Sequence, residues 1–209
     1  MVWEIQAAYE GRYSPGVRHP EQSPDHNAAR GGQSFFDGVV RLLNEGRPMR
    51  HPERMPTTGR IPKPRKRFYA VMRMMDQLAV TEELRDFIEE WEPGVHEFFP
   101  IRLYAKSTGE EMPVTYHILN VCNRIPSIVL DERLLRIERY GEGPDARHFW
   151  FRRSGKDPLP VFNSDAIGGS RIWRDEGSTA RIFASDPFVE AMEKAGFKGW
   201  DKVCHYDEE

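Results

Sequence analysis

The stretch TEELRDFIEEWEPGVHEFFPIRLY, residues 81–104, decides which fold the chain is expected to adopt. Its first half predicts an amphipathic helix over residues 81–92, because four apolar side chains recur at the spacing of one helix face. These side chains are Leu84, Phe87, Ile88 and Trp91. Thr81 suits the N-cap position. Pro93 and Gly94 end the helix before a strand in which apolar and polar residues alternate.

The stretch SDPFVEAMEKAGFKGWDKVCHY, residues 185–206, repeats this pattern. Ser185 or Asp186 suits the N-cap, and the helix predicted over residues 186–195 ends at Gly196, before another strand. Its apolar face consists of Phe188, Ala191, Met192 and Ala195, each of which follows its counterpart by 104 residues. The two stretches therefore predict an internal helix-turn-strand repeat, with a chance match of two generic amphipathic helices as the alternative.

Strand patterns occupy most of the chain between these stretches. Residues 96–105 and 112–122 flank KSTGEE, where Gly109 suits the positive φ of a hairpin loop. Pro100 cannot donate to a strand ladder, which predicts an edge position or a bulge. Residues 147–153 and 158–162 are strand candidates, residues 127–140 fit either a strand and a short helix or two strands, and residues 163–171 are expected to form a loop.

Residues 1–66 are expected to form an irregular N-terminal segment that packs on the main domain, residues 67–209. A strand is predicted at VWEIQ, residues 2–6, and a helix at SFFDGVVRLLNEG, residues 34–46. The segment from Arg47 to Arg67 carries five prolines, which disfavour helix, so it is expected to be extended. These patterns together predict a single α+β domain with a mainly antiparallel sheet and helices packed on it.

The composition restricts the class of protein. A chain of 209 residues with 39% hydrophobic and 30% charged residues is typical of a globular domain. Apolar runs long enough to cross a membrane are absent, and the first residues lack the pattern of a secretory signal. The two cysteines, Cys122 and Cys204, cannot form a disulfide framework. These features predict a cytoplasmic protein without membrane contact.

Sequence motifs for catalysis or cofactor binding are absent. The chain has no dinucleotide-binding, P-loop, zinc-protease or nucleophile-elbow motif, and its histidines and cysteines lack metal-ligand spacing. We therefore expect no enzymatic activity, no metal and no cofactor. The histidines of the predicted strands, expected to be half-exposed, are His96, His117, His148 and His205. The alternative is an enzyme with an unrecognised site made of strand residues such as His117, His148 and Cys122.

Charge is distributed unevenly along the chain, although its net value is −3. Residues 1–80 contain 13 Lys and Arg against 8 Asp and Glu, and the rest contains 17 against 25. A basic strip, which could contact nucleic acid, consists of Arg60, Lys63, Arg65, Lys66 and Arg67. We disfavour nucleic-acid binding, because such proteins normally present a broader basic face. An acidic face of the helix at residues 81–92 consists of Glu82, Glu83, Asp86, Glu89 and Glu90, and Glu92 and Glu97 are expected to add to it.

Three segments, taken in order, resemble a known family. LAVTEELRDFIEEWEPGVHEFFPIRL, YHILNVCNRIPSIVLD and ARIFASDPFVEAMEKAGFKGWDKV are similar to the eleventh immunity-protein family of bacterial polymorphic toxin systems. The resemblance covers residues from Lys66 to Tyr206, and the segment before Lys66 matches no pattern that we can name. It implies an α+β domain that neutralises a toxin by binding it, without catalytic residues to carry over.

The leading hypothesis is therefore a cytoplasmic immunity protein that binds a cognate toxin protein. The acidic face of the helix is either a solvated outer surface or the docking surface for a basic toxin. An enzyme and a nucleic-acid-binding protein that uses Arg60 to Arg67 are the alternatives. The sequence makes no prediction about self-association.

Overall fold

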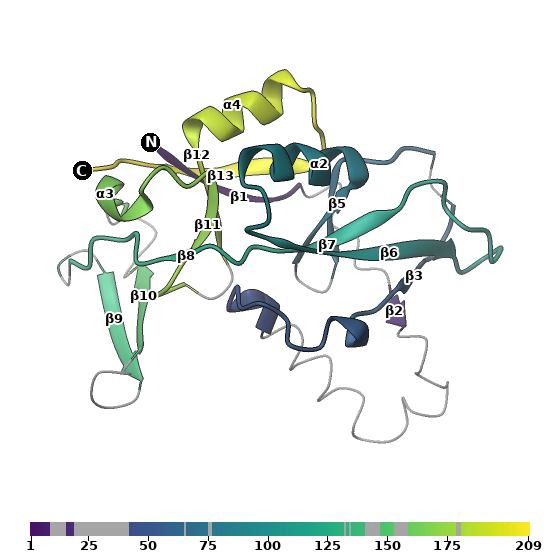
Figure 1. The fold of residues 1–209 in the computed structure, drawn as a ribbon, viewed down its shortest axis with the longest axis horizontal. Helices are drawn as coiled ribbons and strands as arrows, with labels where there is room; N and C mark the ends of the chain where they lie inside the picture. Colours follow the sequence, from purple (N-terminus) through teal and green to yellow (C-terminus); the bar gives the residue numbers. More distant parts are fainter. Residues whose placement is uncertain are drawn as a thin grey trace.

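The computed structural model describes most of the chain (Figure 1). The described residues are 1–8, 16–18, 42–64, 66–74, 77–131, 133, 135–140, 147–152, 159–178 and 181–209. Their strands form a five-stranded sheet, here called sheet A, a six-stranded sheet, called sheet B, and a two-stranded hairpin. The two longest described helices lie together on one side of the sheets in the view of Figure 1. The predicted α+β class is confirmed.

Sheet A has the strand order β13-β1-β12-β11-β8. Its strands are β1 (Val2–Ala7), β8 (Arg124–Ile125), β11 (Ile172–Asp175), β12 (Ile182–Ser185) and β13 (Trp200–Tyr206). Strand β1 lies between β12 and β13 and is antiparallel to both. The two strands predicted near opposite ends of the sequence are thus neighbours in one sheet.

Sheet B has the strand order β2-β3-β6-β7-β5-β4. Its strands are β2 (Gly16–Arg18), β3 (Thr58–Ile61), β4 (Val71–Met74), β5 (Gln77–Thr81), β6 (Glu97–Ala105) and β7 (Tyr116–Asn120). The predicted hairpin is confirmed, since β6 and β7 are antiparallel and Gly109 between them has φ +74°. Pairing of β3 with β6 is parallel.

Pro100 lies in β6, which is an inner strand of sheet B, but at Pro100 itself the described strands pair with β6 on one side only, as the predicted edge position requires. The residue opposite Pro100 on β7 is His117. On the other flank, β3 pairs with β6 only from Arg102 to Ala105. Pro100 therefore lies in the part of β6 that has no described strand on its β3 side. Because no described strand pairs with it there, the absence of its N–H costs no interstrand hydrogen bond on that side.

Each of the two helical stretches lies in its own copy of the same order of strands and helix, one copy in sheet B and one in sheet A. In sheet B, β4 and β5 are antiparallel, helix α2 (Glu82–Trp91) follows, and β6 returns parallel to β5 with β7 between them. In sheet A, β11 and β12 are antiparallel, helix α4 (Asp186–Lys194) follows, and β13 returns parallel to β12 with β1 between them. The predicted repeat is present, and it also includes the strand pair before each helix.

Helices α2 and α4 start directly after a strand, which changes how they are capped. Thr81 and Ser185 occupy the predicted N-cap positions, but neither side chain makes a capping hydrogen bond. Each is the last residue of its strand, and its N–H donates to a backbone carbonyl, that of Ala70 or Arg171. Carboxylates in the first turn of each helix interact favourably with the helix dipole instead.

A shared core joins the two sheets beneath the helices. It contains Ile5, Ile172 and Ile182 of sheet A, Val71, Val80 and Leu119 of sheet B, and Leu84, Ile88, Phe188 and Met192 of the helices. The Phe188 ring lies 5.7 Å from the Phe87 ring and 5.8 Å from the Trp91 ring. Because residues of both repeated arrangements fill one cluster, the predicted packing is confirmed for both helices, except that Ala195 at the end of α4 is exposed.

The two sheets also meet at Gly199, which has φ +97°. A Cβ at this position would lie 2.2 Å from the carbonyl oxygen of Val71, so only glycine allows this approach. The carbonyl of Lys198 accepts from the N–H of Val71 in β4, and that of Gly199 accepts from the N–H of Ala8 after β1. The short connection between α4 and β13 thus bridges the edge of sheet B and sheet A.

Residues 42–57 pack on the opposite face of sheet B from α2, and the chain then enters sheet B at β3. Residues 42–44 are helical, and residues 34–41 of the predicted helix lie outside the described residues. Leu43, Met49, Met55 and Ile61 are buried in one cluster with Ile101 and Leu103. In the segment that we expected to be extended, residues 58–61 are extended and form strand β3, whereas residues 52–54 form a short 3-10 helix, η3 (Pro52–Arg54).

Three further expectations are corrected or resolved by the structure. The predicted loop at residues 163–171 contains a short helix, α3 (Ser164–Ile167), whose cap residue Asn163 accepts from the N–H of Ala166 at 2.9 Å. Residues 127–140 hold strand β9 (Leu135–Tyr140), which pairs with β10 (Arg147–Arg152), and no helix among their described residues. In the candidate strand at 158–162, Phe162 makes only isolated bridges among the described residues.

Candidate partner-binding surface

Helix α2 presents the predicted acidic face to solvent. Its inner side is fixed by Leu84 and Ile88, which are 1% and 2% exposed. The periodicity of the helix then turns the opposite side outward. Glu82, Glu83, Asp86 and Glu90 are exposed, and Glu89 is half-buried. All five predicted carboxylates are thus on one element, four of them accessible to a partner.

Arg85 partly neutralises this acidic face. Its guanidinium forms ion pairs with Glu82 at 3.2 Å and with Asp86 at 2.6 Å. The same group contacts Nε2 of His117 on β7 at 3.1 Å. Glu83 and Glu90, by contrast, make no ion pair or hydrogen bond that the structure records with the described residues. These two carboxylates are the most available for a cationic partner.

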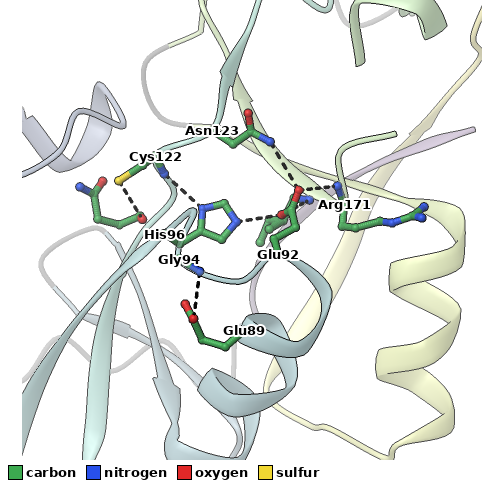
Figure 2. A network of polar contacts seen from close by, with 9 residues as sticks. Glu89, Glu92, Gly94, His96, Cys122, Asn123 and Arg171 are labelled. Atoms are coloured by element: carbon green, nitrogen blue, oxygen red, sulfur yellow. Dashed lines mark hydrogen bonds and ion pairs between the residues drawn. The ribbon is translucent and has the colours of Figure 1, made fainter. Parts of the chain in front are cut away.

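Glu92 does not belong to the acidic face, contrary to expectation, because the chain turns inward at the end of α2. Its side chain is buried and accepts hydrogen bonds from Nε2 of His96 at 2.8 Å and from the backbone N–H groups of Arg171 and Ile172 at 2.9 and 3.1 Å (Figure 2). Burial alone would raise the pKa of Glu92, but these hydrogen bonds lower it overall. Glu92 therefore links the end of α2 to the start of β11.

Glu97 is likewise directed away from the acidic face. Its carboxylate accepts from the backbone N–H of Met49 at 2.9 Å and from Nδ2 of Asn120 at 2.8 Å. The Sγ atom of Cys122 lies 3.8 Å from the same carboxylate. Glu97 thus holds the segment after Gly46 against sheet B. Sequence reasoning missed the inward orientation of Glu92 and Glu97, because periodicity describes a helix but not the residues after its end.

The side chains of the alternative catalytic site do not have the properties of a nucleophile and its base. Burial raises the pKa of the Cys122 thiol to about 12, so this thiol is protonated near neutral pH. The pKa of His117 is lowered by burial and by the Arg85 guanidinium. His96 and His117 are buried rather than half-exposed as expected. His148 lies in β10, and its side chain is outside the described part of the structure.

The basic strip is only partly gathered on one surface. Arg60 is exposed on β3, and Lys63, Lys66 and Arg67 are exposed in the connection that follows. Arg65 lies outside the described residues. Parallel pairing places Arg60 opposite Tyr104 and Thr58 opposite Arg102, so Arg102 joins Arg60 on one face of sheet B. The sequence shows the alternation in β6 but not this pairing.

The described residues contain neither a metal-binding cluster nor a membrane-spanning helix. No group of three or more His, Cys, Asp or Glu side chains in that part of the chain is placed to hold a metal ion. Among the same residues, none of the helices has the length and apolar character needed to cross a membrane. The residues around Gly168 form the C-terminal cap of α3, where Gly168 has φ +58°.

Comparison with family models matches residues 17–203 to the family described as Immunity protein family (Imm11). The match includes both helices and starts well before Lys66, where the resemblance read from the sequence begins. The proline-rich segment and β3 therefore belong to the matched region. A search of curated proteins found no match.

Proposed function

The chain belongs to the Imm11 immunity protein family, and from this premise we propose that it binds a cognate bacterial toxin domain in the cytoplasm and neutralises it. The family match carries the proposal. Neutralisation by binding alone is supported by the protonated thiol of Cys122 and by the engagement of His96 in a buried hydrogen-bond network. Neither residue is placed as an activated catalytic group.

The acidic face of α2 is the proposed docking surface for the toxin. A toxin domain that acts on nucleic acid has a basic cleft, and exposed carboxylates would attract such a cleft and occupy the positions of phosphate groups. Glu83 and Glu90 are accessible and lack ion-pair partners among the described residues. The buried side chains of Leu84 and Ile88 anchor α2 on the core, and this leaves Glu83 and Glu90 on its solvent-exposed side.

A charge-reversal experiment tests this proposal. The toxin domain encoded beside the gene is produced in an inactive form, and its association with the protein is followed by stopped-flow fluorescence at several salt concentrations. Changing Glu83, Asp86 and Glu90 together to Lys should slow association about 10-fold or more at low salt and remove most of its salt dependence. Cells that express the active toxin should lose protection when they carry this variant.

A matched variant controls for net charge. Changing Asp165, Asp201 and Asp207, which are exposed and lie outside α2, to Lys alters the net charge by the same amount. This control should associate within about threefold of the parent. If the α2 variant is folded and protects cells as well as the parent, the acidic face is not the docking surface. If the parent neither binds nor protects, the immunity function itself is refuted.

A further inference from the structure

One face of sheet B is only half covered by α2. The helix packs mainly against β5 and β7, on the face that carries Leu119 and Val80. Every second residue of β6 points to this face, and these residues are accessible to solvent. Pro100 is exposed, the Arg102 side chain is 58% exposed, and Tyr104 is half-buried. The residues between them, Ile101 and Leu103, are buried on the other face. In Figure 1, β6 and β3 extend beyond the end of α2.

The open part of this face is basic. Strand β3 adds Arg60, which lies opposite Tyr104 and is exposed. An exposed lysine follows each of the two strands: Lys106 follows β6, and Lys63 follows β3. The backbone N–H of Lys106 donates to the carbonyl of Ile61 at the end of β3. Two loop carboxylates lie nearby, Glu110 and Glu111. Glu111 accepts from the Tyr104 hydroxyl at 3.1 Å and lies 3.9 Å from Arg102. Four cations thus outnumber two carboxylates.

The acidic face of α2 and this open basic face adjoin each other at Arg85 and His117. Arg85 is on the side of α2 that faces β7, and it contacts His117, which is opposite Pro100 of β6. A partner that covers this region meets carboxylates on one side and guanidinium groups on the other. Charge complementarity therefore requires a partner with two adjacent patches of opposite sign.

We infer that the open face of sheet B around Arg60 and Arg102 is the second half of the toxin-binding surface, and that the toxin meets it with acidic side chains beside its basic cleft. This inference rests on the proposed function and adds the partner's charge pattern to it. A nucleic acid fits the observations less well, because the carboxylates of α2 within the same footprint repel a phosphate backbone. A basic toxin surface without an acidic part would be repelled by Arg60 and Arg102.

Reversing the charges of Arg60 and Arg102 tells an acidic toxin surface from a basic one, because the first would associate more slowly and the second faster. In the same stopped-flow assay, Arg60→Glu combined with Arg102→Glu should slow association with the inactive toxin domain about 10-fold at low salt. Arg60→Gln combined with Arg102→Gln should give a smaller decrease. The matched control, Arg133→Glu combined with Arg136→Glu, reverses two exposed arginines near and on β9 and should leave the association rate within about twofold. Circular dichroism melting verifies that each variant is folded.

Three results would overturn the inference. Faster association of the Arg60/Arg102 reversal variant would show that the toxin surface opposite these residues is basic, and an unchanged rate would show that they lie outside the interface. Binding of a fluorescent single-stranded RNA oligonucleotide by the parent, lost in this variant, would assign the face to nucleic acid. In these cases the immunity function stands if the parent still binds the toxin. If the parent does not bind the toxin, the proposed function fails and this inference fails with it.

Discussion

At the scale of single residues, Glu92 has the largest structural role among the acidic side chains of the α2 region. It is one residue beyond the helix, and its carboxylate accepts from the His96 ring, from the Asn123 amide and from the adjacent backbone N–H groups of Arg171 and Ile172. Glu92 is buried, so removing its carboxylate leaves these donors without an acceptor in the protein interior. Its neighbour Glu90 is exposed and gives a natural comparison.

Glu92→Ala should lower the free energy of unfolding by about 3 kcal/mol, because the buried ring N–H of His96 and the backbone N–H groups of Arg171 and Ile172 lose their acceptor. Glu90→Ala should change it by less than about 0.5 kcal/mol. Urea denaturation followed by tryptophan fluorescence measures both values. Equal effects of the two substitutions would show that the Glu92 network does not stabilise the fold.

The pH dependence of Glu92→Gln supplies a second residue-scale prediction. The pKa of Glu92 is lowered in the folded protein from its ordinary value of 4.5, so the ionised carboxylate stabilises the fold above that pH. This contribution is lost as the pH falls through the lowered value. The difference in unfolding free energy between the parent and Glu92→Gln should therefore be constant from pH 6 to 7 and shrink below about pH 4.5. A difference that grows on acidification would contradict the assignment.

At the scale of elements, the attachment of α2 should depend on its inner face. Leu84→Ala should cost about 2 to 5 kcal/mol, because it leaves a cavity beneath the helix where Leu84 is 1% exposed. Glu83→Ala, at the adjacent exposed position, should cost less than about 0.5 kcal/mol. Thermal unfolding followed by circular dichroism compares the two. A small effect of Leu84→Ala would mean that α2 is held mainly by other contacts.

The elements with strong periodicity could be predicted from the sequence, and the short buried strands could not. Helices α2 and α4 have one apolar side and one polar side, so the spacing of their apolar residues in the sequence predicted the helix bounds to within two residues. Strand β5 and strand β11 are buried at every residue, so the alternation that marks a half-exposed strand is missing. The acidic candidate residues lie on α2, and four of the five are exposed as the periodicity predicted. Arg102, by contrast, joins Arg60 only through a parallel pairing between distant segments.

At the scale of the whole molecule, Gly199 should control how the two sheets meet. Gly196 also has positive φ, +77°, but a Cβ there would have no neighbour within 4 Å. Gly196→Ala should therefore cost about 1 kcal/mol from backbone strain alone, and Gly199→Ala should cost at least about 2 kcal/mol more, because its Cβ would collide with the Val71 carbonyl. Urea denaturation measures both. Equal costs would show that the sheets can separate locally without penalty.

The position of β1 between β12 and β13 has a consequence during synthesis on the ribosome. Trp3 of β1 and Asp186, which follows β12, are 183 residues apart in sequence and linked by a hydrogen bond. At about 5 to 20 residues per second, translation takes roughly 10 to 40 s to produce the residues between them. Sheet B strands β4 to β7 can pair while the chain is still growing, since they are close in sequence. Strand β1 must wait for both of its neighbours, so sheet A is complete only after β13 has left the ribosomal tunnel.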